Sequence, residues 1–219
     1  MEFIKPKAAL PGLVYYVWVW KNNHPILNCY GIKQMKQIFL LIALSPAFAF
    51  TANCQSLIPE AKLLLILPNS QWPALTRELI GERILYSSKR MPIIDKSGRK
   101  VIPNIGITLE SIPENIDLKT FSSALLEDLQ TASTQDKQPL RVLNKYHFGG
   151  TDRIIPAKNM LGYKASYQDE NLINHLVYVI YIVNNNFGIQ AIFDTTAELF
   201  PKCSPEFLKT IRAMQTLIK

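Results

Sequence analysis

Apolar residues in the part of the chain that follows residue 60 are arranged in strand-like patterns. Residues 61–67 form an apolar run, interrupted only by Lys62, that ends at Pro68; its length fits a buried strand, and a helical turn would fit it as well. Residues 82–90 predict a second strand. Between residues 105 and 111 apolar and polar positions alternate, which is typical of a half-buried strand. The segment 76–81 predicts one short helical turn.

The second half of the chain contains a denser series of strand patterns. Residues 140–148 and residues 160–167 predict one strand each. The strongest strand pattern covers residues 172–183, which are rich in β-branched and aromatic side chains. The asparagine run 184–186 predicts a turn that tolerates left-handed backbone, so residues 187–194 are expected to return as the partner strand of a long antiparallel hairpin.

Two segments combine helical spacing with capping residues. Asp117 is a good N-cap, and apolar residues recur at spacings of four through a predicted helix at 118–132. Near the end of the chain, Ser204 predicts a second N-cap, Pro205 the first helical position, and Glu206 a favourable charge for the helix dipole. This closing helix is expected to cover the sheet with one apolar face, formed by Phe207, Ile211, Met214 and Ile218.

The order of these elements predicts the fold class. Strands cluster along the chain instead of alternating with helices, which favours an α+β fold with a mainly antiparallel β-sheet covered by helices over a doubly wound nucleotide-binding fold. Hydrophobic residues make up 48% of the chain, enough for a real core, and charged residues 19%, too few for a disordered protein. We therefore expect residues 50–219 to form a single α+β domain.

The segment that begins at Met35 has the three parts of a secretory signal. Lys36 supplies a short positive region, residues 38–44 form a compact apolar run, and the sequence Ala-Phe-Ala at 47–49 resembles a cleavage site. We expect residues 35–49 to be a signal peptide and the mature protein to be periplasmic or secreted. The first 34 residues are then a start-site extension; alternatively, the hydrophobic stretch 13–20 is a real structural element.

Cysteine usage agrees with export. Cys54 and Cys203 lie near the two ends of the expected mature chain and can form one disulfide in an oxidising compartment. The alternative is two unpaired thiols. Cys54 also raises the question of a lipoprotein, but Thr51 and Asn53 depart from the lipobox pattern, so soluble release is the preferred interpretation.

The net charge of +7 does not indicate a nucleic-acid-binding protein. Five of the 24 basic residues and one of the 17 acidic residues precede residue 50, which leaves only +3 on the remainder. One local basic cluster remains, and its simplest interpretation is a solvated hairpin loop, with a polyanion site as the alternative. The cluster consists of Lys89, Arg90, Lys96, Arg99 and Lys100.

The C-terminal half resembles two known families. The segments MLGYKASY, HLVYVIYIVNNNFGIQAIFDTT and FPKCSPEFLKTIRAMQTL resemble the ending of PsbP-like domains and of the related Mog-type Ran-binding fold. In both families a strand with a Gly-aromatic pair precedes a long hairpin and a closing helix; here Phe207, Ile211 and Met214 take the apolar places on that helix. The resemblance covers about residues 60–219 and implies an α/β/α sandwich with a non-enzymatic role. It carries over no functional residue.

Few residues have the spacing of a catalytic site. The sequence contains no GxSxG, HExxH, Walker or GxGxxG motif, and no Cys/His spacing typical of zinc, so neither a cofactor nor a metal is expected. His147 and Asp152 flank a glycine pair and are weak catalytic candidates, since a general base needs an acid that orients it. The alternative is a loop of ordinary polar residues. His175 falls within a strand and is expected to be a satisfied interior or edge histidine.

These observations favour an exported, soluble, non-catalytic binding or accessory protein. We expect its partner to be a protein or an envelope component, without nucleic acid and without a membrane span after signal cleavage; the sequence predicts no oligomeric state. One alternative is a small-ligand or lipid carrier that uses the aromatic face of the sheet, and another is a small hydrolase that uses His147 and Asp152. The aromatic residues in question, which otherwise serve sheet-to-helix packing, are Tyr163, Tyr167, Tyr178, Tyr181 and Phe193.

Overall fold

The computed structural model describes residues 55–131 and 139–217. Three predictions lie wholly or partly outside these ranges: the start-site extension 1–34, the signal peptide 35–49, and the role of Cys54. They stay predictions, as does the single domain at 50–219.

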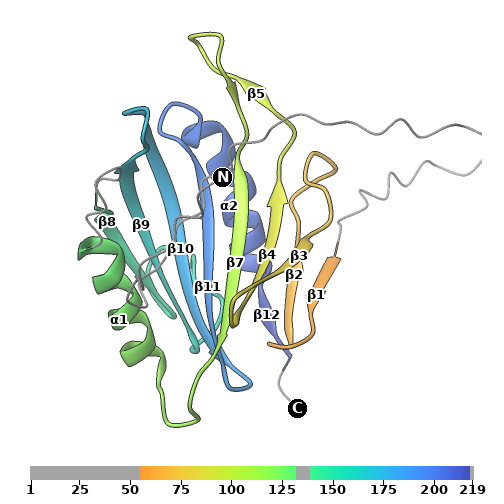
Figure 1. The fold of residues 1–219 in the computed structure, drawn as a ribbon, viewed down its shortest axis with the longest axis vertical. Coiled ribbons are helices and arrows are strands. Elements are labelled where there is room, and N and C mark those ends of the chain that lie inside the picture. Colours follow the sequence, from red (N-terminus) through yellow and green to blue (C-terminus); the bar gives the residue numbers. More distant parts are fainter. Residues whose placement is uncertain (1–54, 132–138, 218–219) are drawn as a thin grey trace, which may run out of the picture. The chain divides into compact units, whose positions relative to one another are not determined.

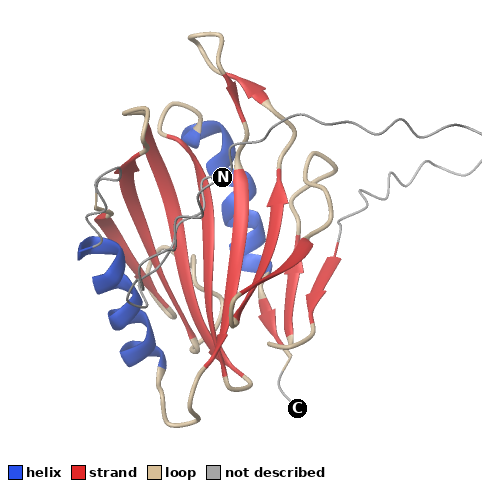
Figure 2. Ribbon diagram, viewed as in Figure 1, coloured by secondary structure: helices blue, strands red, loops and turns tan. Residues whose placement is uncertain are grey.

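The described residues are built around one seven-stranded sheet (Figures 1 and 2). Every neighbouring pair of strands is antiparallel. The strands, in their order across the sheet, are β3 (Thr76–Ile80), β4 (Arg83–Lys89), β7 (Asn104–Ser111), β11 (Phe187–Thr196), β10 (Asn174–Asn184), β9 (Met160–Gln168) and β8 (Arg141–His147).

Two smaller sheets accompany the large one. One has the strand order β1 (Gln55–Ile58), β2 (Leu63–Ile66) and β12 (Gln215–Thr216), so it joins the beginning and the end of the described chain. The other is a two-stranded hairpin of β5 (Ile93–Ile94) and β6 (Lys100–Val101), inserted between β4 and β7. Asp95 accepts hydrogen bonds at the start of the turn in this hairpin, and Gly98 has a φ of 82°.

The two helices cover opposite faces of the large sheet (Figure 2). Helix α1 (Leu118–Thr131) begins as predicted, with the Thr120 amide donating to Oδ1 of Asp117 over 2.7 Å. It packs on β9 and β10, whereas helix α2 (Phe200–Ala213) packs on β10, β11 and β2. The described structure is therefore an α+β fold with a mainly antiparallel sheet covered by helices, which confirms the predicted fold class.

A separate core lies on each side of the sheet because its central strands are apolar on both faces. Toward α1, Val177, Val179 and Tyr181 of β10 pack with Phe121 and Leu125. Toward α2, a larger core includes the residues that alternate with them on β10 and also reaches the small sheet. The alternation predicted for β7 is confirmed by the complete burial of Ile105, Ile107 and Leu109 in this second core.

Three predictions about local structure are wrong. The closing helix ends at Ala213, so Met214 lies beyond the helix on which it was expected, and Ile218 lies outside the described residues. The segment expected to be a helical turn, 76–81, is the edge strand β3, which forms because its backbone pairs with β4 while Gly81, at φ 60°, makes the turn between them. The closing helix begins at Phe200, not after Ser204. Pro201 is accepted in the first turn of the helix because the N–H group that it lacks would have no partner there. Phe200 is buried beside Tyr178, which packs this turn against the sheet.

Gly188 on β11 provides a test of how α1 packs on the sheet. A Cβ atom at this position would overlap the Phe121 ring, whereas one at Gly106 on the neighbouring strand β7 would meet no atom within 4 Å. Gly188→Ala should therefore lower the free energy of unfolding by about 1–3 kcal/mol, the usual cost of overpacking, measured by urea denaturation. Gly106→Ala is the matched control and should cause no such loss. Equal effects of the two substitutions would contradict the packing described.

Candidate functional site

Helix α2 borders an open groove on its face of the sheet, with a volume of about 500 Å³. One wall is a stripe of α2 residues spaced by four: Phe200, Ser204, Leu208 and Arg212. The other wall comes from the sheet, where Lys164 of β9 and Tyr178 of β10 are direct partners in the strand register. We call these six residues the α2 groove.

The groove follows from the way α2 is divided into stripes. Cys203, Phe207 and Ile211 point into the core and are almost fully buried. The adjacent stripe is turned by about 100° from these residues, toward the strands beyond the helix. Phe200 at its start is still buried, whereas Ser204 and Leu208 are half-buried and Arg212 is exposed. The groove thus lies along the edge of the helix, beside the part of the sheet that the helix does not cover.

The chemistry of the α2 groove combines positive charge, hydroxyl groups and apolar surface. The Lys164 ammonium lies 5.0 Å from the centre of the Phe200 ring, a cation–π arrangement. The hydroxyl groups of Tyr178 and Ser204 are 3.0 Å apart and share a hydrogen bond. No described residue that lines the groove is acidic. Such a groove suits a ligand that carries both a carboxylate or similar anion and an apolar group.

Glu206 holds α2 in place on the side away from the groove. Its carboxylate accepts two hydrogen bonds from Arg90, at 2.9 and 3.2 Å, one from the Trp72 indole at 2.8 Å, and one from the Asn69 amide at 3.0 Å. Burial raises the pKa of Glu206, but these bonds and the charge of Arg90 outweigh it, so the pKa is lowered. The residue predicted to complement the helix dipole instead ties the helix interior to two distant loops.

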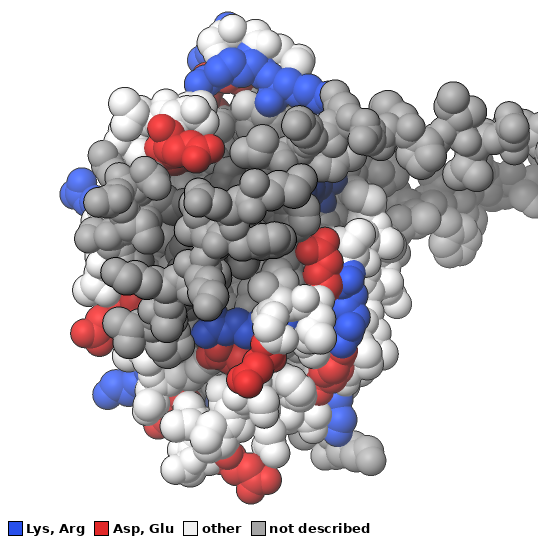
Figure 3. Space-filling view, in the orientation of Figure 1, with Lys and Arg blue, Asp and Glu red and all other residues white. Residues whose placement is uncertain are grey.

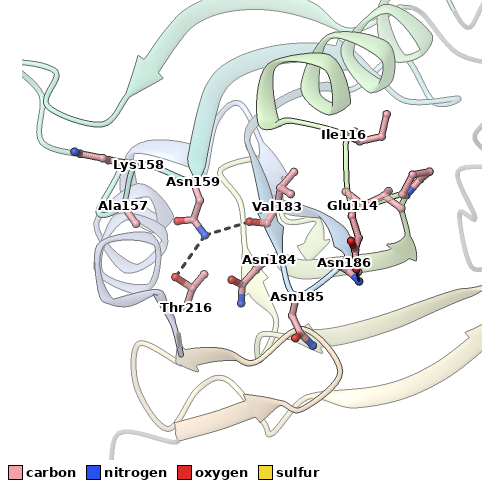
Figure 4. Close-up of a pocket in the computed structure, with 12 residues that line it drawn as sticks. Glu114, Ile116, Ala157, Lys158, Asn159, Val183, Asn184, Asn185, Asn186 and Thr216 are labelled. Carbon is pink, nitrogen blue, oxygen red and sulfur yellow. Dashed lines mark hydrogen bonds between the residues drawn. The ribbon is translucent and has the colours of Figure 1, made fainter. Parts of the chain in front are cut away.

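A second pocket, of about 580 Å³, is lined by four asparagines among other residues (Figure 4). Asn184, Asn185 and Asn186 belong to the β10–β11 turn, where the last two have φ values of 52° and 60°, as predicted for this turn. Asn159 precedes β9 and donates to the Val183 carbonyl over 3.2 Å.

The asparagine side chains in this pocket connect separate loops. Asn184 donates to the Ala61 carbonyl over 2.7 Å and Asn185 to the Glu60 carbonyl over 2.9 Å, which ties the turn to the small sheet. Asn186 donates to Glu114 over 3.2 Å, in the loop that leads into α1. Because each amide group serves a structural bond, we interpret the pocket as a junction between loops and not as the principal site.

His175 lies in a hydrogen-bonded cluster at the other end of the sheet. Its Nδ1 is 2.9 Å from Oδ1 of Asp194 and its Nε2 is 3.6 Å from Oδ2 of Asp169. The Tyr167 hydroxyl donates to Asp194 over 2.8 Å, and the Tyr167 ring stacks on the imidazole. Burial lowers the pKa of His175, but the two carboxylates outweigh it and the pKa is raised. The cluster confirms the expectation of a satisfied strand histidine.

The two weak catalytic candidates are not joined in the structure. His147 ends β8 and Asp152 follows in the next loop, and both are exposed. Within residues 55–131 and 139–217, no hydrogen bond or ion pair connects their side chains. The backbone carbonyl of His147 accepts from the Gly150 amide over 3.1 Å, which closes the turn at the predicted glycine pair. A catalytic role for them stays a prediction.

Cys203 is buried on α2, and no disulfide joins it to another described residue. Burial is also the main reason why the pKa of this thiol is raised. Its expected partner, Cys54, lies outside the described residues, so the disulfide between Cys54 and Cys203 stays a prediction. Over the described ranges, no group of three or more His, Cys, Asp or Glu side chains could hold a metal ion.

The five aromatic residues proposed to line a ligand groove are divided between the two faces of the sheet. Tyr163, Tyr167 and Tyr181 face α1, whereas Tyr178 and Phe193 face α2. Four of the five are almost completely buried, so their main role is packing. Tyr178 alone of these five lines the α2 groove.

Sequence reasoning missed most of the α2 groove. The spacing of Phe200, Ser204, Leu208 and Arg212 is visible in the sequence, but it crosses the helix start that Ser204 and Pro205 had predicted. Lys164 was part of a predicted strand without a predicted role, because nothing local shows which strand a helix will border.

Comparisons with known proteins give similarities to solved structures only. Neither a protein-family model nor a curated protein sequence matches the chain. The Ran-binding protein Mog1p of Saccharomyces cerevisiae has a similar structure, with a TM-score of 0.47 and 12% identity over 76% of this chain and 96% of Mog1p. PsbP (CyanoP) of Synechocystis sp. PCC 6803 is similar with a TM-score of 0.42 and 10% identity, over 80% of this chain and 98% of PsbP. The expected weak resemblance to PsbP-like and Mog-type proteins is thereby confirmed.

The helices within the described residues are α1 and α2. Neither α1 nor α2 is long and apolar enough to cross a bilayer.

Glu206→Gln should destabilise the protein because it removes the charge that Arg90 and Trp72 bind. We expect a loss of about 1–3 kcal/mol in the free energy of unfolding at neutral pH, measured by urea denaturation with circular dichroism as the probe. The pKa of Glu206 is lowered from 4.5 in the folded state. The stabilisation that its ionised carboxylate gives to the folded protein is therefore complete above pH 4.5, and it is lost as the pH falls through the folded-state pKa. Glu127→Gln, on the exposed surface of α1, should have little effect; an equal loss there would contradict this role.

The His175 cluster should make stability depend on pH. Because the pKa of His175 is raised above 6.5, the stabilisation from its protonated form is complete below pH 6.5 and is lost as the pH rises through the folded-state pKa. The difference in unfolding free energy between the wild type and His175→Gln should therefore shrink with increasing pH. Urea denaturation at several pH values measures it, and a difference that grows with pH would contradict the assignment.

Proposed function

We propose that this chain is an exported, non-catalytic binding protein that holds an acidic, partly apolar segment of a partner protein in the α2 groove. The observation that carries the proposal is the composition of the groove: Lys164 and Arg212 supply positive charge, and the half-buried Leu208 supplies apolar surface beside the largely buried Phe200 ring. Export is proposed on the signal-like pattern at residues 35–49.

The length of the groove favours a peptide over a small molecule. From Phe200 to Arg212 the helix rises roughly 18 Å at 1.5 Å per residue. An extended chain covers this distance with about five residues. The groove is also open along its side, so a segment of a larger protein can enter without a conformational change.

Charge and burial suggest how such a segment is held. Lys164 is half-buried and held over the Phe200 ring, so an acidic group that approaches it meets a cation whose position is already restricted. Arg212 is exposed at the other end of the stripe, where its guanidinium can donate two parallel hydrogen bonds to one carboxylate. The hydroxyl groups of Tyr178 and Ser204 lie between them and can bond to the peptide backbone.

The enzyme interpretation has weaker support. A hydrolase would need His147 to be oriented by an acid, and Asp152 makes no bond to it among the described residues. The clearest histidine–carboxylate pair, His175 with Asp194, places carboxylates at both ring nitrogens and leaves neither one directed at a substrate.

The binding proposal can be tested with short labelled peptides that combine acidic and apolar residues. Wild-type protein should bind these peptides, measured by fluorescence anisotropy, and binding should weaken as salt is added. The double variant Lys164→Glu/Arg212→Glu should bind at least about tenfold more weakly, because two attractive contacts become repulsive.

The matched control is Lys119→Glu/Lys158→Glu, which makes the same change in net charge at exposed positions outside the groove. It should bind as the wild type does. Equal binding by the groove variant and the wild type would place the site elsewhere. Failure of the wild-type protein to bind any such peptide, and to recover any partner from an envelope extract, would contradict the proposed function.

A further inference from the structure

The hairpin between β4 and β7, residues 91–102, projects beyond the end of the large sheet (Figure 1). We call it the basic hairpin. Only part of it contributes to the core: Ile93 is 7% exposed and packs with the residues under α2. The rest of the hairpin faces outward, and its composition differs from that of an ordinary solvated loop.

Three large apolar side chains on the basic hairpin are exposed. Ile94 is 62% exposed, Met91 57% and Ile102 46%. The strand register pairs Ile94 with Lys100, and alternation puts Ile102 on the same face as Lys100. One face of the hairpin therefore presents apolar and cationic side chains next to each other. Exposure of this much apolar surface along one projecting hairpin is typical of an interaction site.

Positive charge is concentrated around these apolar residues. Lys96, Arg99 and Lys100 are all exposed, and the space-filling view shows Lys and Arg side chains gathered over the projecting tip (Figure 3). The one acidic residue of the hairpin, Asp95, has a fully buried side chain and is paired with Arg99 at 2.7 Å. Lys96 and Lys100 are in no ion pair with a described residue.

The basic hairpin is held rigidly despite its position. Oδ1 of Asp95 accepts hydrogen bonds from the Ser97 and Arg99 amides, at 2.9 and 2.8 Å. Burial raises the pKa of Asp95, but these bonds and Arg99 outweigh it, and the pKa lies at about 2. The Lys96 amide donates to Glu198 over 2.6 Å, which ties the tip to the loop before α2.

We propose that the basic hairpin is a contact for an anionic membrane surface. Lys96 and Lys100 lie where they can meet phosphate headgroups, and Ile94, Ile102 and Met91 can enter the boundary between headgroups and acyl chains. This combination of a cationic and an apolar set on one projection matches what an anionic lipid surface binds. Neither of the two pockets described above is lined by residues of the hairpin, so this projection fits a broad anionic surface better than a single peptide segment.

The rigid turn strengthens the proposal because it removes an ordering cost from binding. The backbone around Asp95 already has the conformation in which Ile94 and Lys100 share a face. The contact is separate from the α2 groove and makes use of none of its residues, so either proposal can fail without the other.

Vesicle sedimentation tests the proposal directly. The whole protein should bind vesicles made of equal parts phosphatidylglycerol and phosphatidylcholine, and high salt should weaken that binding. Two hairpin variants, Lys96→Glu/Lys100→Glu and Ile94→Ser/Ile102→Ser, should each bind at least about tenfold more weakly. All four positions are in the outward-facing part of the hairpin, so urea denaturation should give the same stability for both variants as for the wild type.

Two matched controls separate the hairpin from general effects of charge and apolar surface. Lys119→Glu/Lys158→Glu changes the charge equally at other exposed sites, and Leu172→Ser removes an apolar side chain that is 71% exposed in a different loop. Both should bind vesicles like the wild type. Because all these proteins share the same residues outside the changed positions, any contribution from other apolar segments is common to them.

Three results would overturn the proposal. The first is unchanged vesicle binding by both hairpin variants, and the second is an equal loss of binding in the controls. The third is the absence of vesicle binding by the wild type; if the hairpin variants then lose binding to an acidic protein instead, the hairpin is a protein contact and the membrane assignment is wrong.

Discussion

Strand β10 carries apolar side chains on both of its faces, and this fact constrains the rest of the described structure. Val177, Val179 and Tyr181 must be covered on one side, and Tyr178, Ile180 and Ile182 on the other. A single helix can cover only one face, so two helices from distant parts of the chain are needed. The sheet becomes the middle layer of three, and the two cores never meet.

The position of α2 follows from contacts at both of its sides. Toward the core it inserts Phe207 and Ile211, and on its outer side Glu206 binds Arg90, Trp72 and Asn69. With the helix held there, its neighbouring stripe meets β9 at Lys164 and forms the α2 groove. Glu198 connects the start of the same helix to the basic hairpin. Contacts with α2 or with the loop before it therefore hold both of the proposed binding surfaces in position.

Local patterns were sufficient for much of the fold. Alternation identified β7, β-branched and aromatic content identified β10, and the asparagine run identified the turn that joins β10 to β11. Asp117 marked the start of α1 because an N-cap bonds to an amide only three residues away. These features depend on neighbours in the sequence, so the sequence alone determined them, together with the α+β class that follows from their order.

Only the tertiary structure decided the rest. Strand β3 has no alternation of apolar and polar residues, and it forms because its backbone pairs with that of β4. Helix α2 begins before Ser204, despite the capping pattern there, because Phe200 is buried on the sheet. Glu206 meets Arg90 across 116 positions of sequence. The α2 groove likewise needs Lys164 of β9. In the sequence, both β10 and β11 lie between this strand and α2. Such contacts depend on where the sheet brings distant segments together, and no local spacing encodes that.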